Sequence, residues 1–180
     1  MRKPRITQEG ATYHVVARAN RREFILAEKA MKQVFVDTVS RARKKYRFAV
    51  TNICLMNNHF HLMITPAKGE SISRVMQWIL SVFARRFNLH HGYQGHVWYD
   101  RFKSKPIAGL RQFVATFAYI CDNPVKAGMV ERALEYAYGG CVLLRAGPER
   151  IVDPPAALVR LLFPSFAHRQ IAAPRGVKVT

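Results

Sequence analysis

Two kinds of hydrophobic periodicity alternate along most of this chain, and their order leaves few folds open. Short runs rich in β-branched and aromatic residues indicate strands, and longer segments with apolar residues every three or four positions indicate amphipathic helices. Strands are expected at residues 13–19, 48–56, 59–66 and 96–109, and helices at 27–46, 71–89 and 110–121. The predicted order is strand, helix, strand, strand, helix, strand, helix.

This order is the split βαβ pattern of a ferredoxin-like sheet, extended by one helix. We therefore expect an α+β protein whose βαββαβ strands form one antiparallel sheet. Near the C-terminus, Asp153-Pro154-Pro155 followed by three leucines has the N-cap and early-proline signature of a short helix. The last dozen residues are expected to be a loose basic tail.

The charge of the chain points to a polyanionic partner. Its 180 residues include 29 Lys and Arg against 11 Asp and Glu, a formal net charge of +18, and the hydrophobic share of 49% is enough for a core. Lysine and arginine that neutralise phosphates release condensed counterions, which drives binding to nucleic acids of any sequence. A generally basic surface is the alternative, because net charge bears on association and not on fold.

Other classes of protein fit the sequence poorly. No apolar run approaches the roughly 18 to 20 residues that span a bilayer, and the basic N-terminus lacks the apolar stretch of a secretory signal. Cys54, Cys121 and Cys141 are odd in number and widely spaced. We expect free, buried thiols in a reducing cytoplasm, with no zinc-type pairing and no membrane partner.

A histidine pair is the first candidate for chemistry. In the strand at 59–66, the period of two places His59 and His61 on one face, with the apolar residues between them on the other. Neutral imidazoles on alternate residues can share a divalent metal ion that polarises a phosphodiester oxygen. The pattern also fits two polar residues on a half-exposed face. A rival cluster, in an expected glycine-rich loop where side chains are usually solvated, comprises His90, His91 and His96.

The third helix carries a candidate nucleophile. Tyr119 and Asn123 are four residues apart, so both can lie on one helical face, with Asn123 as an amide-oxygen metal ligand. A free phenol, with a pKa of about 10, attacks only after a base takes its proton. The alternative for Tyr119 is a core aromatic. Because Pro124 follows Asn123, we expect the helix to end near there, and the alternative role for Asn123 is the N-cap of a short new helix.

Four segments together resemble the REP-associated tyrosine transposases. They are YHVVARAN (13–20), MNNHFHLMITP (56–66), GHVWYDRFKS (95–104) and YICDNPVKAGMV (119–130). These transposases belong to the HUH class, named for two histidines that flank a bulky apolar residue, and they are relatives of the small IS200-like single-strand transposases. The resemblance covers about residues 10–135, and we place a catalytic domain at 1–135 and a C-terminal extension at 136–180.

The resemblance implies a site and a reaction. His59 and His61 match the metal ligands for Mg²⁺ or Mn²⁺, Tyr119 matches the nucleophile, and Asn123 matches a polar residue that completes the metal shell. The tyrosine helix would cover the histidine face of the sheet. The phenol would cut single-stranded DNA and form a 5′-phosphotyrosine link. The resemblance further implies a bacterial, cytoplasmic, nucleoid-associated protein, a monomer or homodimer, with no small-molecule substrate.

The implied DNA partner is an imperfect hairpin of repetitive extragenic palindromes with adjoining single strand. We expect phosphate contacts from Arg18, Arg21, Arg22, Arg85, Arg86, Arg101, Lys103 and Lys105. Trp98 and Tyr99 fit either base stacking or core packing, and they depart from the small or polar residues of many relatives. Two other functions stay open: a non-catalytic DNA- or RNA-hairpin-binding module on the same fold, and a metal-dependent nuclease in which water attacks.

Overall fold

The computed structural model describes residues 7–143 and 151–153. The strands are β1 (Tyr13–Arg18), β2 (Phe48–Leu55), β3 (His59–Pro66) and β4 (Lys103–Pro106). The helices are α1 (Lys29–Lys45), α2 (Ile72–His91), α3 (Leu110–Lys126) and the short α4 (Gly140–Leu143). Two 3-10 turns are η1 (Asn20–Arg22) and η2 (Ala133–Glu135). The predicted order of strands and helices is confirmed.

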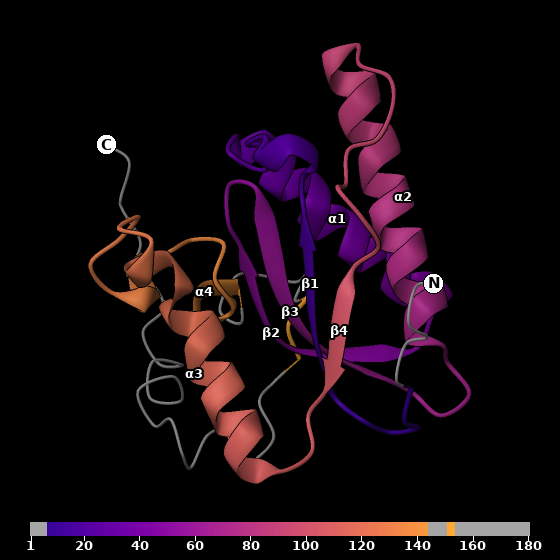
Figure 1. Ribbon diagram of the computed structural model, residues 1–180, viewed down its shortest axis with the longest axis vertical. Coiled ribbons are helices and arrows are strands. Elements are labelled where there is room, and N and C mark those ends of the chain that lie inside the picture. Colours follow the sequence, from indigo (N-terminus) through magenta and orange to yellow (C-terminus); the bar gives the residue numbers. More distant parts are fainter. Residues whose placement is uncertain (1–6, 144–150, 154–180) are drawn as a thin grey trace, which may run out of the picture.

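The four strands form one antiparallel sheet in the order β2-β3-β1-β4, which is the ferredoxin-like arrangement. Helices α1 and α2 lie together on one side of this sheet, and α3 lies on the other (Figure 1). The α+β fold class is therefore confirmed. No helix within the described ranges is long and apolar enough to span a bilayer.

Alternation along the strands builds two separate cores. On β3, Phe60, Leu62 and Ile64 face α1 and α2 and belong to the larger cluster. The opposite face of the sheet contributes Cys54 and Met63 to a smaller cluster, whose helix α3 supplies Phe117, Ile120 and Cys121. Successive side chains of β3 point to opposite faces of the sheet, and helices cover both faces. Strand β3 is therefore buried along most of its length.

The expectation that the third helix ends before Pro124 is wrong. Helix α3 continues to Lys126 with Pro124 inside it, and Gly128 follows with a φ of 66°. A proline inside a helix loses one backbone hydrogen bond, at a cost of about 3 kcal/mol. Here Pro124 is buried with the apolar stripe of α3 that faces the sheet. Packing of this stripe offsets the lost bond, so Asn123 is not an N-cap.

Two further boundaries differ from the sequence-based expectation. His90 and His91 are the last residues of α2 rather than part of a loop, and Gly92 closes the helix in the left-handed conformation. The strand expected at 96–109 is reduced to β4 and an isolated bridge between Ala19 and Trp98. Trp98 donates its indole N–H to the Leu80 carbonyl oxygen at 3.0 Å, which draws the chain toward α2 before β4 begins.

The three cysteines are free and buried, as predicted. Cys121 on α3 and Cys141 on α4 lie in contact, with their Sγ atoms 3.3 Å apart. The short helix expected after Asp153 lies outside the described residues, and so does the basic tail. The proposed boundary between residues 135 and 136 stays a prediction.

A buried asparagine ties the sheet to α3. Asn52 is 1% exposed. It stands where the pairing of β2 with β3 becomes irregular, between Val50 and Asn52. Its side-chain oxygen accepts the Ile53 N–H at 2.8 Å, and its amide donates to the Phe117 carbonyl at 3.1 Å. The polar groups of this side chain therefore fix the helix that carries Tyr119.

We expect Asn52→Ala to lower the free energy of unfolding by about 2 kcal/mol, because a buried N–H loses its acceptor and a cavity opens. Urea denaturation measures the change. Thr51→Ala, at the half-buried neighbouring position, is the matched control and should stay within about 0.5 kcal/mol of the parent. Equal stability of the two variants would contradict a role for Asn52 in holding α3.

Candidate active site

The pairing register of β1 with β3 places a third histidine beside the predicted pair. Arg18 lies opposite His59, and His14 lies opposite Met63. Residues opposite each other in an antiparallel pair share a face of the sheet. His14 and Arg18 therefore join His59 and His61 on the face that α3 covers.

The imidazoles of His59 and His61 are each oriented by a contact at Nδ1. His61 Nδ1 lies 3.0 Å from His14 Nε2, and the two rings are stacked with centroids 5.2 Å apart. His59 Nδ1 lies 2.8 Å from Asn58 Oδ1. An amide oxygen only accepts hydrogen bonds, so His59 donates from Nδ1 and keeps the lone pair of Nε2 free. His61 Nε2 is buried with no hydrogen-bond partner.

Burial keeps these imidazoles neutral. It lowers the pKa of His61 to about 3, with further lowering from His59, His14 and Arg18. Burial, and then the Arg18 guanidinium, lower the pKa of His59. The pKa of His14 is lowered by burial and then by Lys105. Near pH 7 all three rings are therefore neutral, and a neutral imidazole is the form that binds a metal ion. With His61 donating from Nδ1 to His14 Nε2, the lone pair of His61 Nε2 is left for the ion.

Tyr119 faces the imidazoles from α3. Its ring centroid is 5.4 Å from that of His61, with the rings at 89°, and 6.1 Å from that of His14. The side chain is 43% exposed, so it is not a core aromatic. Lys126 lies about two helical turns after Tyr119 on α3, and its Nζ atom is 5.4 Å from the Tyr119 ring centroid. The phenol therefore sits at the boundary between the buried imidazoles and solvent.

Asn123 lies one turn after Tyr119, as the spacing predicts. Its side-chain amide donates to the Tyr119 carbonyl oxygen at 2.8 Å. This bond orients the NH₂ group toward the helix backbone and leaves the side-chain oxygen as the remaining polar atom. The role of Asn123 as a metal ligand stays a prediction.

The residues present fit a divalent metal ion between His59 and His61. Their ring centroids are 5.0 Å apart, each ring has Nδ1 engaged by a neighbour, and neither Nε2 is used by the protein. Metal-binding histidines commonly have their second nitrogen held in this way, because the hydrogen bond fixes the tautomer and the ring orientation. His14 and Asn58 are the two residues that orient the pair.

The predicted DNA-contact residues lie in three different places. Arg18, Lys103 and Lys105 are exposed around the histidine face, since β4 pairs with β1 through Lys103 opposite Val16 and Lys105 opposite His14. Arg21 and Arg22 are exposed in η1. The remaining three are set apart from the face: Arg85, Arg86 and Arg101.

Of these three, Arg85 and Arg86 are on α2, across the sheet from Tyr119. Arg86 is engaged with α1, where it lies 3.9 Å from Asp37 and donates to the Val34 carbonyl. Arg101 lines a cavity of about 620 Å³ between α2 and the segment before β4. Contacts of all eight residues with DNA stay predictions.

The two aromatic residues before β4 separate in the structure. Trp98 packs its ring against Phe60 and Phe83, with centroids 5.7 and 5.4 Å away. Tyr99 is 75% exposed and lines the same cavity as Arg101. Trp98 therefore has the core role, and Tyr99 alone is available for stacking.

The sheet is ferredoxin-like, two histidines lie on its central strand β3, and the helix that carries Tyr119 lies over them. This arrangement is the one expected of the HUH class of single-strand transposases. The sequence model of the family described as "Transposase IS200 like" matches residues 7–123, which include both histidines and Tyr119. The chain belongs to this transposase family. Comparison with curated proteins gives no match.

The chain is similar in fold to several solved structures, of which two are described. The structure of a REP-associated tyrosine transposase bound to a REP hairpin has a TM-score of 0.68 and 19% sequence identity, and the match covers 87% of this chain and 93% of that one. At this identity the likeness establishes the fold. A candidate transposase from Deinococcus radiodurans R1 has a TM-score of 0.46 and 15% identity, over 68% of this chain and 97% of that one.

Sequence reasoning missed His14 as a residue of this face. Alternation within the strand at 13–19 places His14 and Arg18 on one side, which was a usable signal. The partner strand and its register are set by long-range pairing, which periodicity does not report. His14 and His61 are 47 residues apart in the chain.

Proposed function

We propose that this protein cleaves and rejoins single-stranded DNA beside hairpin elements, with Tyr119 as the nucleophile and a 5′-phosphotyrosine intermediate. The observation that supports the proposal most strongly is the position of Tyr119: its ring lies 5.4 Å from that of His61, centroid to centroid, while the side chain remains open to solvent. A phosphate group placed there can touch the phenol and the histidine pair at once.

His59 and His61 would hold Mg²⁺ or Mn²⁺ through their Nε2 atoms, with the amide oxygen of Asn123 as a third protein ligand. The bound ion would polarise a non-bridging oxygen of the scissile phosphate and offset the charge that develops on it. His14 orients His61 by the 3.0 Å contact between their rings. Lys126, whose Nζ atom lies 5.4 Å from the Tyr119 ring centroid, brings a positive charge to the place where the scissile phosphate would lie.

The reaction proposed for Tyr119 is a transesterification. The phenol oxygen attacks the phosphorus atom, a new bond forms between them, and the bond from phosphorus to the 3′ oxygen breaks. The phenol proton passes to solvent, and the leaving 3′ oxygen takes a proton to become a free 3′-hydroxyl. The phosphotyrosine ester conserves the energy of the broken bond, so a later attack by a 3′-hydroxyl can rejoin the strand.

The charge of the histidine face supports a DNA substrate. Arg18, Lys103 and Lys105 surround the site, and Arg21 and Arg22 continue the basic surface beyond Arg18. These side chains can contact phosphates on both sides of a scissile position. A similarly folded protein is a REP-associated tyrosine transposase bound to a REP hairpin, and we propose the same class of DNA for this chain.

The test uses hairpin oligonucleotides with a single-stranded flank, labelled at either end, in Mn²⁺ or Mg²⁺. We expect the label on the 3′ side of the cut to migrate with the protein on a denaturing gel, and the other fragment to end in a free 3′-hydroxyl. Chelation should abolish both products. Binding that survives chelation without an adduct would favour a non-catalytic hairpin-binding module, and free 5′-phosphate ends without an adduct would favour attack by water.

The orientation of His61 by His14 can be tested separately. We expect His14→Ala to weaken the apparent Mn²⁺ affinity in the cleavage reaction by about 10- to 100-fold, because the histidine loses the partner that fixes its ring. Excess Mn²⁺ should restore most of the rate. His96→Ala, at an exposed position outside this face, is the control and should leave the Mn²⁺ midpoint unchanged. An unchanged midpoint in His14→Ala would contradict the role given to His14.

A further inference from the structure

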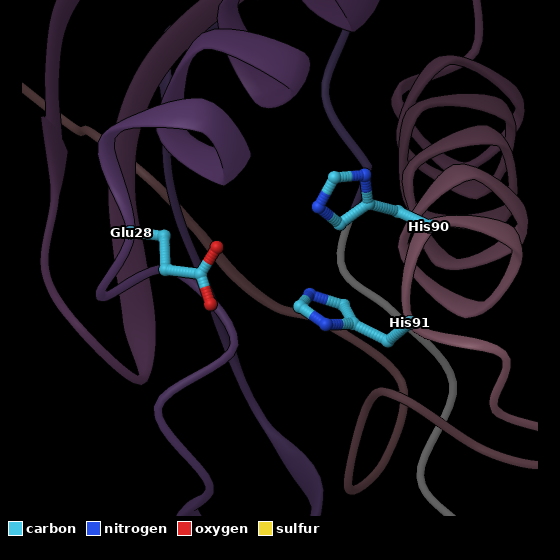
Figure 2. A group of neighbouring side chains, drawn as sticks. All are labelled: Glu28, His90 and His91. Atoms are coloured by element: carbon cyan, nitrogen blue, oxygen red, sulfur yellow. The ribbon is translucent and has the colours of Figure 1, made fainter.

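A second group of metal-ligand side chains lies where α1 begins and α2 ends (Figure 2). Glu28 directly precedes α1, and His90 and His91 are the last two residues of α2. One ligand atom from each of the three lies within 4.8 Å of the others. In Figure 2 both imidazoles point toward the Glu28 carboxylate. Over residues 7–143 and 151–153, no other three His, Cys, Asp or Glu side chains meet this criterion.

The environment of His91 is a second observation that points to a ligand. Its Nε2 atom is buried and has no hydrogen-bond partner. The ring is held between Phe87 and Tyr93, with centroids 4.5 and 5.5 Å away. Buried polar atoms in proteins are nearly always paired, so an unpaired nitrogen on a fixed ring is unusual. Packing therefore holds this imidazole with its Nε2 atom unused by the protein.

We propose that Glu28, His90 and His91 bind one Zn²⁺-type transition metal ion, with solvent in the fourth position. Two imidazoles and one carboxylate form a donor set that suits zinc and its neighbours among the first-row metals. Zinc takes such ligands at about 2.0–2.2 Å, so two ligand atoms of a tetrahedral site are about 3.3–3.6 Å apart. The observed separations are all within 4.8 Å, so the ligand atoms would close in by about 1 Å on binding, through rotation of the two exposed side chains, Glu28 and His90.

This cation site is separate from the proposed active site. Helices α1 and α2 pack on the face of the sheet opposite α3, whereas Tyr119 is on α3. The ion would join two points that are 62 positions apart in the chain, the start of α1 and the end of α2. The chain then turns at Gly92 toward the exposed segment that precedes β4. Binding would therefore stabilise the junction from which this segment departs.

The test must measure Zn²⁺ binding at this site separately from binding at His59 and His61, and it uses protein without a histidine tag. In a His59→Ala/His61→Ala background we expect one equivalent of Zn²⁺ to bind in competition with a chromophoric chelator. Co²⁺ should give the d–d absorption of a site with nitrogen and oxygen ligands. Adding Glu28→Gln and His90→Ala should abolish this equivalent, and adding His96→Ala instead should not.

Both substitutions at the site are mild for the fold. Glu28 makes no side-chain capping bond to α1, and His90 is exposed. Circular dichroism of the metal-free variants should therefore match the background. We also expect Zn²⁺ at about 100 times its Kd to raise the Tm of the background by about 5–10 °C, and to leave the Tm of the Glu28→Gln/His90→Ala variant unchanged.

Three results would overturn the proposal. The first is that the His59→Ala/His61→Ala background binds no Zn²⁺. The second is that the bound Zn²⁺ equivalent is retained when Glu28→Gln and His90→Ala are added, and the third is that it is lost when His96→Ala is added. The proposed DNA cleavage does not enter any of these measurements. The reverse comparison completes the design: in the parent protein, Glu28→Gln/His90→Ala should remove one Zn²⁺ equivalent and retain the one bound by His59 and His61.

Discussion

Tyr119→Phe is expected to abolish the covalent protein–DNA adduct and to lower single-strand cleavage by at least about 10³-fold, because no other group in the site would supply the attacking oxygen. The substitution keeps the ring that faces His61 and removes only the hydroxyl. Binding to hairpin DNA should change little. Adduct formation is measured on a denaturing gel with end-labelled DNA, and hairpin binding by anisotropy in chelator.

Tyr93→Phe is the matched control for Tyr119→Phe. Tyr93 is an exposed tyrosine that follows α2, on the other side of the sheet, and loses the same atom when it is replaced. The control should retain full cleavage. If Tyr119→Phe also cuts at the parent rate, the tyrosine is structural and water or another residue is the nucleophile.

His61→Ala and His59→Ala are expected to reduce metal-dependent cleavage by about 10²-fold or more, since each leaves a single imidazole to hold the ion. Excess Mn²⁺ should rescue His59→Ala in part. His61 is 5% exposed, so its removal also leaves a cavity, whereas His59 is half-buried and its variant tests metal binding with less disturbance of the fold. Mn²⁺ titrations of cleavage, with Tm measured alongside, check both expectations. Cleavage by His59→Ala with the parent Mn²⁺ midpoint would contradict the ligand assignment.

Periodicity predicted the sheet and the helices because each strand and helix here has a strong local pattern. The pattern of β3 placed His59 and His61 on one face, and the structure has α3 over that face. The end of α3 was mispredicted, because the local rule that a proline ends a helix ignores the burial that retains Pro124. Tertiary packing overrode a local preference at this position.

Residue spacing did not predict the contacts between segments that are distant in the sequence. His14 reaches His61 through a strand register, and Glu28 reaches His90 and His91 through the packing of α1 on α2. Neither arrangement has a signature in residue spacing. The assignment of His90 and His91 to a loop also hid the second arrangement, because only as part of α2 are they carried to the start of α1.

Residues 151–153 return to the outer edge of the sheet. Asp153 donates its N–H to the Val50 carbonyl and accepts the Val50 N–H on its carboxylate, and Ile151 and Val152 are buried in the larger core. The unpaired backbone groups of an edge strand can recruit the same strand of another molecule. Residues 151–153 therefore satisfy both backbone polar groups of Val50 in β2. These groups are then unavailable for pairing with a strand of another copy. We expect a protein shortened to end before residue 151 to self-associate more than the parent, as measured by sedimentation velocity, because the backbone groups of Val50 lose their partners.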